Sequence, residues 1–221
     1  MVVLANERLI LALPKGRILE ETIRLTRGAG IEIEAGFDDP DDRQLRFRTN
    51  HDELDVIRVR AFDVPTYVAF GAAHFGVAGA DVMMELDYPE LYAPLDLGIG
   101  KCRLVVAGPK EDSGRDDLGR LSHIRIATKY PAITRKYFAA RGVQAECIML
   151  NGAVELAPGL GLSRQIVDLV QTGSTLKANN LVEIEEIASI TARLIINRTA
   201  LKTRTEQVNN WIERFREAAD A

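Results

Sequence analysis

Two series of apolar strands and amphipathic helices constrain the fold of this chain more than any other feature. The first series predicts strands at Arg8–Leu13, Asp55–Val59 and Phe75–Val77, and helices at Lys15–Ala29, Val64–Gly71 and Val82–Leu86. This alternation of strand and helix is typical of a parallel α/β sheet. In such a sheet the functional residues follow the carboxyl ends of the strands.

The second series lies around a polar segment, Pro109–Leu121. It predicts strands at Cys102–Ala107, Ile124–Ala127 and Ala145–Met149, and helices at Ala132–Arg141 and Gly161–Val170. The last helix is indicated by four apolar residues whose spacing puts them on one helical face: Leu162, Ile166, Leu169 and Val170. Asp168 is then expected near the C-terminal end of a helix.

Two further elements close the chain. They are a strand at Ala192–Ile196 and an amphipathic helix at Asn209–Ala219, anchored by Trp211 and Phe215. Because the late strand can return to the first series, we expect an α/β fold with two lobes around a cleft. Lobe I comprises residues 1–98 and 195–221, and lobe II comprises residues 99–194.

The composition argues against several classes of protein. The 221 residues are 47% hydrophobic, enough for a substantial core, and the net charge of −4 argues against a nucleic-acid-binding protein. No apolar stretch approaches the roughly 18 residues that cross a bilayer, and Glu7 and Arg8 interrupt any signal-peptide pattern. We therefore expect a cytoplasmic protein that enters no membrane.

The cysteines and histidines indicate neither a disulfide nor a zinc site. Cys102 and Cys147 lack metal-ligand spacing and are interpreted as free thiols in a reducing cytosol. The three histidines are scattered outside any Cys/His cluster, so a zinc site is improbable. The acidic run at 38–42 could suggest a metal site, but a solvated turn is the favoured interpretation.

The run Asp168–Thr175 carries the most informative functional signal. It gathers a carboxylate, three hydroxyl side chains and a glycine: Asp168, Thr172, Gly173, Ser174 and Thr175. A carboxylate suits the hydroxyls of a ribose, and the Thr-Gly-Ser-Thr turn offers hydroxyls and backbone N–H groups to a phosphate. The run predicts a site for a phosphoribosyl group. The alternative is an ordinary Ser/Thr N-cap that opens a helix at Thr175–Asn180.

A second candidate site is basic. Lys15, Gly16 and Arg17 stand where the first strand turns into a helix, an arrangement that favours anion binding. The alternative is a basic first turn on a solvated helix. Arg60 follows the strand Asp55–Val59, a place for a residue that faces the cleft.

Seven runs, in this order, resemble ATP phosphoribosyltransferases. They are Ala12–Arg17, Val59–Tyr67, Phe75–Asp81, Leu95–Val106, Ile126–Pro131, Asn151–Pro158 and Asp168–Glu183. The resemblance extends from about Leu9 to about Asn197. It implies two lobes of the type II periplasmic-binding-protein kind, with the second inserted in the first.

The resemblance also implies an activity: transfer of the phosphoribosyl group of PRPP to N1 of ATP, with release of pyrophosphate, at the first step of histidine biosynthesis. Mg²⁺ is the expected cofactor. The chain resembles the short form of the family, a catalytic subunit that is expected to form a homo-oligomer. Short-form enzymes work with a separate regulatory subunit resembling histidyl-tRNA synthetase.

Residue roles follow from the same resemblance. Arg60 and Arg43 match settings in which family arginines lie at the pyrophosphate of PRPP and the phosphates of ATP. Glu155 is expected to bind a ribose hydroxyl or a water of Mg²⁺, although it could be an exposed loop carboxylate. The chain departs from common family residues at four positions, which affects local subsites: Ala80, Ala153, Arg164 and Asn180.

Two other functions remain open from the residues alone. A non-catalytic small-molecule binder could use the same bilobed fold. A phosphoribosyltransferase for another base would also need a Thr-Gly turn, but such enzymes usually place two acidic residues before it on a strand. Here Ile166 and Val167 precede a lone Asp168.

Overall fold

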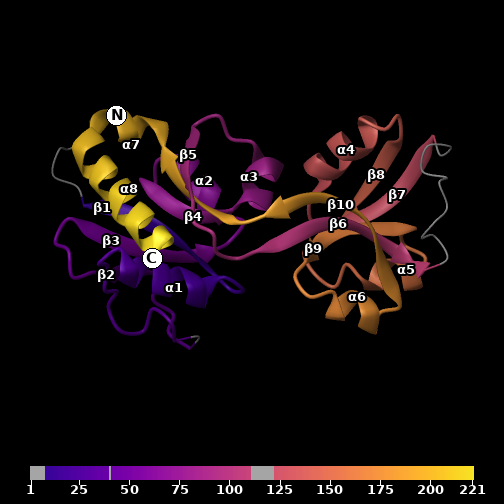
Figure 1. Ribbon diagram of the computed structural model, residues 1–221, viewed down its shortest axis with the longest axis horizontal. Helices are drawn as coiled ribbons and strands as arrows, with labels where there is room; N and C mark the ends of the chain where they lie inside the picture. The colour runs from indigo at the N-terminus through magenta and orange to yellow at the C-terminus, as the bar shows by residue number, and fades with distance from the viewer. Residues whose placement is uncertain (1–7, 40, 111–121) are drawn as a thin grey trace. The chain divides into compact units, whose positions relative to one another are not determined.

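A computed structural model describes residues 8–39, 41–110 and 122–221 (Figure 1). By its internal contacts the chain divides into two compact units. Unit 1 comprises Met1–Gly100 and Thr191–Ala221, and unit 2 comprises Lys101–Ile190. Unit 2 is therefore inserted in unit 1, as expected for the fold that the sequence resembles.

Unit 1 is built on a six-stranded sheet in the order β2-β3-β1-β4-β11-β5. The strands are β1 (Leu9–Lys15), β2 (Arg46–Arg48), β3 (Leu54–Arg60), β4 (Phe75–Gly79), β5 (Leu91–Asp96) and β11 (Ala192–Asn197). Strands β1, β3 and β4 are mutually parallel, whereas β2 and β11 are antiparallel to their neighbours. The parallel prediction is correct for these three strands, and the sheet as a whole is mixed. All of β11 belongs to unit 1, whereas the predicted limit of lobe II falls inside this strand.

Helices pack on both faces of this sheet. They are α1 (Leu19–Gly28), α2 (Val64–Ala69), α3 (Ala80–Leu86), α7 (Arg198–Thr203) and α8 (Thr205–Asp220). Helix α8 buries Val208, Trp211, Ile212 and Phe215, which are spaced three, four and seven apart and share one face. This face packs in one core with residues of α1 and β1, and α2 packs in a separate core with Ala12 and Ile195. The predicted closing helix and its two aromatic anchors are confirmed.

Unit 2 contains a five-stranded sheet in the order β10-β6-β9-β7-β8. The strands are β6 (Cys102–Pro109), β7 (His123–Thr128), β8 (Gln144–Met149), β9 (Gln165–Val170) and β10 (Leu181–Ile190), and the helices are α4 (Pro131–Ala139), α5 (Leu156–Gly159) and α6 (Ser174–Ala178). Strands β7, β8 and β9 are parallel, and β6 is antiparallel to both β9 and β10. The carboxyl ends of the three parallel strands thus share one edge.

The predicted helix at Gly161–Val170 is wrong, because residues 165–170 form strand β9. This strand lies inside the sheet, hydrogen-bonded to β6 on one side and β7 on the other. Gln165, Ile166 and Val167 are all buried, so residues on both faces are buried and the alternation of a half-buried strand is missing. In such a run, residues four apart are apolar by chance and imitate a helical face. Asp168 is therefore a strand residue.

Other features bear on the remaining expectations. Strands β5 and β10 and helices α5 and α7 were not predicted, and the polar segment Pro109–Leu121 lies outside the described residues from 111 onward. Cys102 and Cys147 are free thiols. Among the described residues, no helix is long and apolar enough to cross a membrane.

Candidate functional site

In unit 1, two cations end adjacent parallel strands. Lys15 is the last residue of β1 and Arg60 is the last residue of β3, and their Cα atoms are paired in the sheet register. Both side chains are exposed. Neighbouring strands lie about 4.8 Å apart, so the two cationic side chains start from adjacent points of the sheet. An anion at this edge would relieve their repulsion.

The chain turns into α1 directly after Lys15. Gly16 has a φ of +103°, a conformation that L side chains rarely adopt, and this explains the glycine between the two cations. The guanidinium of Arg17 donates from both terminal nitrogens to the carbonyl of Gly100, each at 3.3 Å. Glu21 accepts from the N–H of Gly100 at 2.8 Å. Arg17 therefore holds the backbone at Gly100, the last residue of unit 1 before the chain enters unit 2.

Arg43 lies in the exposed segment before β2. Because β2 is antiparallel to β3 and Arg58 N–H donates to the carbonyl of Leu45 at 2.8 Å, this segment runs toward the carboxyl end of β3. The side chain of Arg58 is buried, and it donates to the carbonyls of Asp42 at 2.6 Å and Gln44 at 3.2 Å. Arg58 thus holds the segment that carries Arg43. Sequence reasoning missed it, although a lone arginine on the inner face of an apolar strand was the available signal.

Asp81 is buried in the first turn of α3, and the N-cap of that helix is Gly79. Asp81 is therefore not the N-cap of this helix. A Cβ at position 79 would lie 2.1 Å from Oδ1 of Asp81, so a side chain there would force the carboxylate out of place. The Gly-Ala-Asp run is a requirement of local packing.

In unit 2, the turn after β9 presents the predicted hydroxyls. Thr172, Ser174 and Thr175 are exposed, and the hydroxyls of Thr172 and Ser174 lie 3.0 Å apart. Helix α6 begins at Ser174 with Gly173 as its N-cap, and no side chain caps it. The ordinary Ser/Thr N-cap interpretation is thus wrong. Gly173 has a φ of +76°, and the N–H of Ser174 donates to Oγ1 of Thr172 at 3.4 Å. The first N–H groups of a helix have no partners within the helix.

Asp168 lies two residues before the end of β9 and is half-buried. Its Oδ1 accepts from the N–H of Leu169 at 2.8 Å. Because β9 ends at Val170, Asp168 and the Thr172–Thr175 turn belong to the same edge of the sheet. The structure therefore brings together the residues of this motif.

A buried threonine connects the ends of β7 and β9. Thr128 donates to the carbonyl of Val167 at 2.7 Å and accepts from the N–H of Tyr130 at 2.9 Å. Tyr130 is the N-cap of α4, and Thr134 donates to its carbonyl at 2.7 Å. These bonds place Lys129 at the edge that carries Asp168. The run Ile126–Pro131 contributes to the family resemblance, but the sequence predicted no role for Lys129.

Glu155 follows β8 at the same edge. It is half-buried at the N-cap of α5, and its neighbours Val154 and Ala157 are packed in the core of unit 2. This anchoring distinguishes it from a freely exposed loop carboxylate. Two of the residues that depart from the common family pattern have an unfavourable backbone conformation. Ala153 and Asn180 adopt φ values of +51° and +57°. Asparagine tolerates this region better than alanine.

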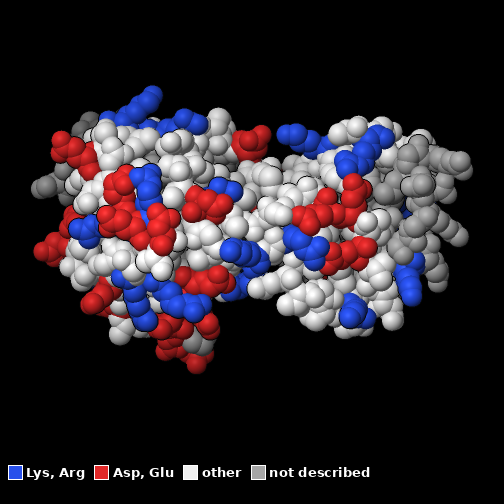
Figure 2. Space-filling view, viewed as in Figure 1, with Lys and Arg blue, Asp and Glu red and all other residues white. Residues whose placement is uncertain are grey.

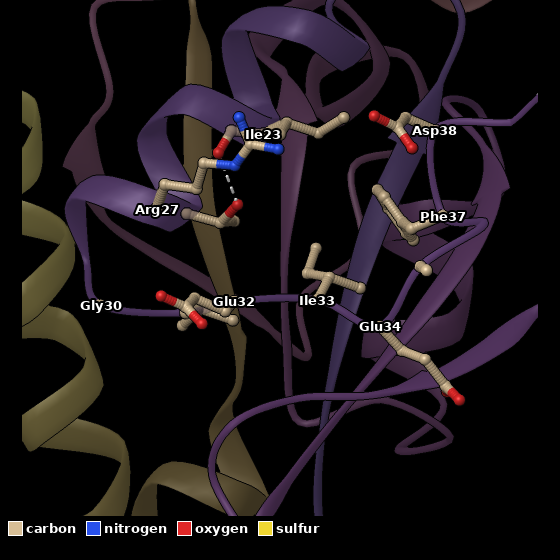
Figure 3. Close-up of a pocket in the computed structure, with 11 residues that line it drawn as sticks. Ile23, Arg27, Gly30, Glu32, Ile33, Glu34, Phe37 and Asp38 are labelled. Atoms are coloured by element: carbon tan, nitrogen blue, oxygen red, sulfur yellow. Dashed lines mark hydrogen bonds between the residues drawn. The ribbon is translucent and has the colours of Figure 1, made fainter.

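A separate pocket of about 460 Å³ lies beside α1 in unit 1 (Figure 3). Its lining includes Arg27 and three carboxylates, Glu32, Glu34 and Asp38. None of the predicted site residues lines it. Among the residues that the structure describes, no group of three or more His, Cys, Asp and Glu side chains could hold a metal ion.

The fold indicates the broad class to which the protein belongs. The chain shares its fold with the alkanesulfonate-binding protein SsuA from Xanthomonas axonopodis pv. citri, at a TM-score of 0.56 and 11% identity over 97% of this chain and 74% of that one. This likeness shows a bilobed fold of the type II periplasmic-binding-protein kind.

The family follows from closer relatives. The family model of ATP phosphoribosyltransferase (HisG) matches residues 60–217, and the chain belongs to this family. It is 66% identical over 215 residues to the ATP phosphoribosyltransferase of Rhodospirillum rubrum, covering 97% of this chain and 95% of that protein. The protein of Paramagnetospirillum magneticum is 64% identical over 213 residues, covering 96% of this chain and 97% of that protein. A Thermotoga maritima structure, an ATP phosphoribosyl transferase (HisG:HisZ) complex, matches at a TM-score of 0.81 and 34% identity over 96% of this chain and 98% of that one.

Proposed function

We propose that this enzyme of histidine biosynthesis joins C1 of PRPP to N1 of the adenine of ATP, and that the strand-end edge of unit 2 holds the phosphoribosyl group. Asp168 accepts from the ribose hydroxyls, and Thr172, Gly173, Ser174 and Thr175 bind the 5′-phosphate. The observation that carries this proposal is the turn after β9, whose hydroxyls are exposed and whose helix has no side-chain cap. One N–H of the turn, that of Ser174, donates to Oγ1 of Thr172 at a long 3.4 Å, and the hydroxyls and the remaining N–H groups of the first helical turn suit an oxyanion.

The basic edge of unit 1 suits the other anionic groups of the substrates. Negative charge grows on the departing pyrophosphate as its bond to C1 breaks, and fixed cations stabilise this charge most strongly in the transition state. We assign this role to Arg60, with Arg43 as the second catalytic arginine. Lys15 and the turn of Gly16 and Arg17 bind substrate phosphate, supported by the pairing of Lys15 with Arg60.

Mg²⁺ is the proposed cofactor, and it would arrive with the polyphosphate of a substrate. Mg²⁺ usually keeps several waters and is held by substrate phosphates and one or two carboxylates. The anchored carboxylate of Glu155 is suited to accept a hydrogen bond from one of those waters or from a ribose hydroxyl. The residues would bind and orient the substrates, and the ion would neutralise charge on the leaving group.

A direct test is an absorbance assay with ATP, PRPP and Mg²⁺ that follows an N1-alkylated adenine product. Product should form with ATP and should depend on Asp168. Formation with a different base, but not with ATP, would favour the other class of phosphoribosyltransferase. Tight binding without any product would favour a non-catalytic binder.

The form of the enzyme is part of the proposal. We propose a cytoplasmic homo-oligomer of the short form that takes a regulatory subunit resembling histidyl-tRNA synthetase. The proposal is supported by the curated relatives, of which the chain covers 95% and 97%, and by the Thermotoga maritima structure, a complex of two kinds of subunit. The isolated chain should titrate with histidine without useful inhibition, and the synthetase-like partner should restore inhibition. Tight inhibition of the isolated chain would contradict the short form.

A further inference from the structure

A second basic cavity lies in unit 1, at the edge of the sheet opposite to Lys15 and Arg60. Its volume is about 630 Å³, within the roughly 300–1,000 Å³ of small-molecule sites. The lining comes from the amino end of β1, the segment between α2 and β4, and the segment from the end of β11 to the residue after α7. Figure 2 shows Lys and Arg side chains gathered over α7 in this unit.

The described lining of this cavity is basic. Arg8, Arg46 and Arg204 line it, and none of the described lining residues is acidic. Two of these arginines contact the carboxylate of Asp55, which is 1% exposed and accepts from Arg8 at 2.6 Å and from Arg46 at 2.6 Å. A third arginine, Arg48, approaches the same carboxylate at 3.4 Å. One buried negative charge is thus shared by three arginines.

Arg8 and Arg46 keep donors for a ligand. Arg46 uses Nε and one terminal nitrogen on Asp55, and Arg8 uses Nε on Asp55 and one terminal nitrogen on backbone carbonyls. Within the described part of the chain, the other terminal nitrogen of each has no hydrogen bond. Asp55 thereby fixes two guanidinium groups at the cavity and leaves their outer donors available.

A histidine adds a neutral donor. Nδ1 of His74 lies 3.0 Å from the N–H of Ile10 and accepts its hydrogen bond, so the ring proton is on Nε2. Burial, together with the charge of Arg204, lowers the pKa of His74 to about 4, and the ring is neutral at pH 7. The exposed hydroxyls of Thr199 and Thr203 also line the cavity.

An aromatic side chain borders the same cavity. Phe70 is 74% exposed, and its ring meets that of Tyr88 edge-on at 5.8 Å, so that an open face remains. An exposed phenyl ring beside fixed guanidinium groups suits a ligand that joins a flat ring to an oxyanion.

We propose that this cavity binds a phosphate monoester that carries a flat ring, of the nucleoside monophosphate class, at a site separate from the predicted substrate residues. Arg8, Arg46, Arg204 and Nε2–H of His74 bind the phosphate, and Phe70 contacts the ring. The inference does not rest on the proposed function, because no residue of that site lines the cavity.

The imidazole of His74 is a local reporter for this site. The full chain, carrying Thr172→Val to weaken the predicted phosphate turn, is titrated at pH 7.5 with uridine monophosphate or inorganic phosphate while the histidine ring signals are followed by NMR. The His74 signals should shift saturably, and inorganic phosphate should bind at least five times more weakly. Phe70→Ala should abolish that preference, and equal affinities in the parent would contradict the role of the ring.

Matched arginines separate binding from general electrostatics. Arg46 and Arg48 stand on the same strand, are exposed and contact Asp55, but only Arg46 lines the cavity. Arg46→Gln should weaken binding at least tenfold, whereas Arg48→Gln should change it less than twofold. Equal losses in both variants, or no saturable shift of His74, would overturn the proposal. If Arg46→Gln fails to fold, Arg204→Gln serves in its place.

Discussion

The two units carry different chemical groups at the corresponding edges of their sheets, where the parallel strands end. Each has three parallel strands whose carboxyl ends meet. In unit 1 two of these strands end in the cations Lys15 and Arg60, whereas in unit 2 strand β9 is followed by hydroxyls and backbone N–H groups at Thr172–Thr175. A charge acts over several ångströms and grows in effect as a transition state gains charge. A hydroxyl or N–H group forms a hydrogen bond only at short distance, which suits binding of a phosphate in the ground state.

The largest effect should come from unit 1. Arg60→Ala should lower kcat by about 100-fold, with little change in KM, because an interaction that strengthens in the transition state is removed. Steady-state kinetics with ATP and PRPP measure this. Arg24→Ala, which removes an exposed cation from α1, is the control and should stay near wild type. A change confined to the KM for ATP would move Arg60 to a ground-state role and weaken the comparison.

The carboxylate of unit 2 should give the next largest effect. Asp168→Asn keeps the shape but removes the charged acceptor, and a charge-assisted hydrogen bond contributes about 1.5–3 kcal/mol, so PRPP affinity or turnover should fall at least roughly tenfold. Kinetics and thermal unfolding, measured together, separate this loss from misfolding. If Asp168→Asn folded normally and kept wild-type kinetics, Asp168 would not bind the ribose.

The sequence predicted the location of these residues at the sheet edges better than it predicted their secondary structure. Lys15 and Arg60 were expected close after strands because β1 and β3 are short apolar runs, although Lys15 was assigned to the following helix and is in fact the last residue of β1. Asp168 was assigned to a helix because β9 is buried on both faces, and an interior strand has no alternation to read. The motif itself remained informative, since a carboxylate two residues before a strand end still reaches the edge.

Residues that act through tertiary contacts were beyond the sequence. Arg58 bonds to backbone carbonyls up to 22 residues away, and Thr128 bonds to Val167, 39 residues away. Neither partner can be identified before the sheet order is known. The strands β5 and β10 were missed for a related reason, because half of their residues are only partly buried and their sequences lack a clear apolar period.

The free energy of unfolding should depend on acid pH through a histidine of unit 1. The lowered pKa of His74, about 4 in the folded protein against 6.5, means that below pH 6.5 the unfolded chain takes up a proton that the folded chain refuses. The free energy of unfolding should then fall by about 1–2 kcal/mol between pH 6.5 and 4, discounted for partial exposure of the ring, and should be insensitive to this group above pH 6.5.

Urea unfolding of wild type and His74→Asn across this range isolates the contribution of unit 1, because the asparagine oxygen can still accept from Ile10. In unit 2, burial raises the pKa of Glu185, but hydrogen bonding and the Arg141 ion pair at 2.6 Å lower it on balance below 4.5, so its contribution is lost only at more acidic pH. Parallel pH dependence of the two proteins would show that His74 does not titrate as expected.

The smallest effect should come from a single hydroxyl of the turn. Thr172→Val removes one neutral hydrogen bond to the 5′-phosphate, worth about 0.5–1.5 kcal/mol, so the KM for PRPP should rise roughly two- to tenfold while kcat changes little. Thr172→Ser restores the hydroxyl, which lies 3.0 Å from that of Ser174 in the wild type, and should recover most of the affinity. This pattern is the opposite of that expected for Arg60, where kcat carries the loss. If Thr172→Val instead lowered kcat as strongly as Arg60→Ala, both edges would act mainly in the transition state, and the proposed division between charge stabilisation in unit 1 and ground-state binding in unit 2 would be wrong.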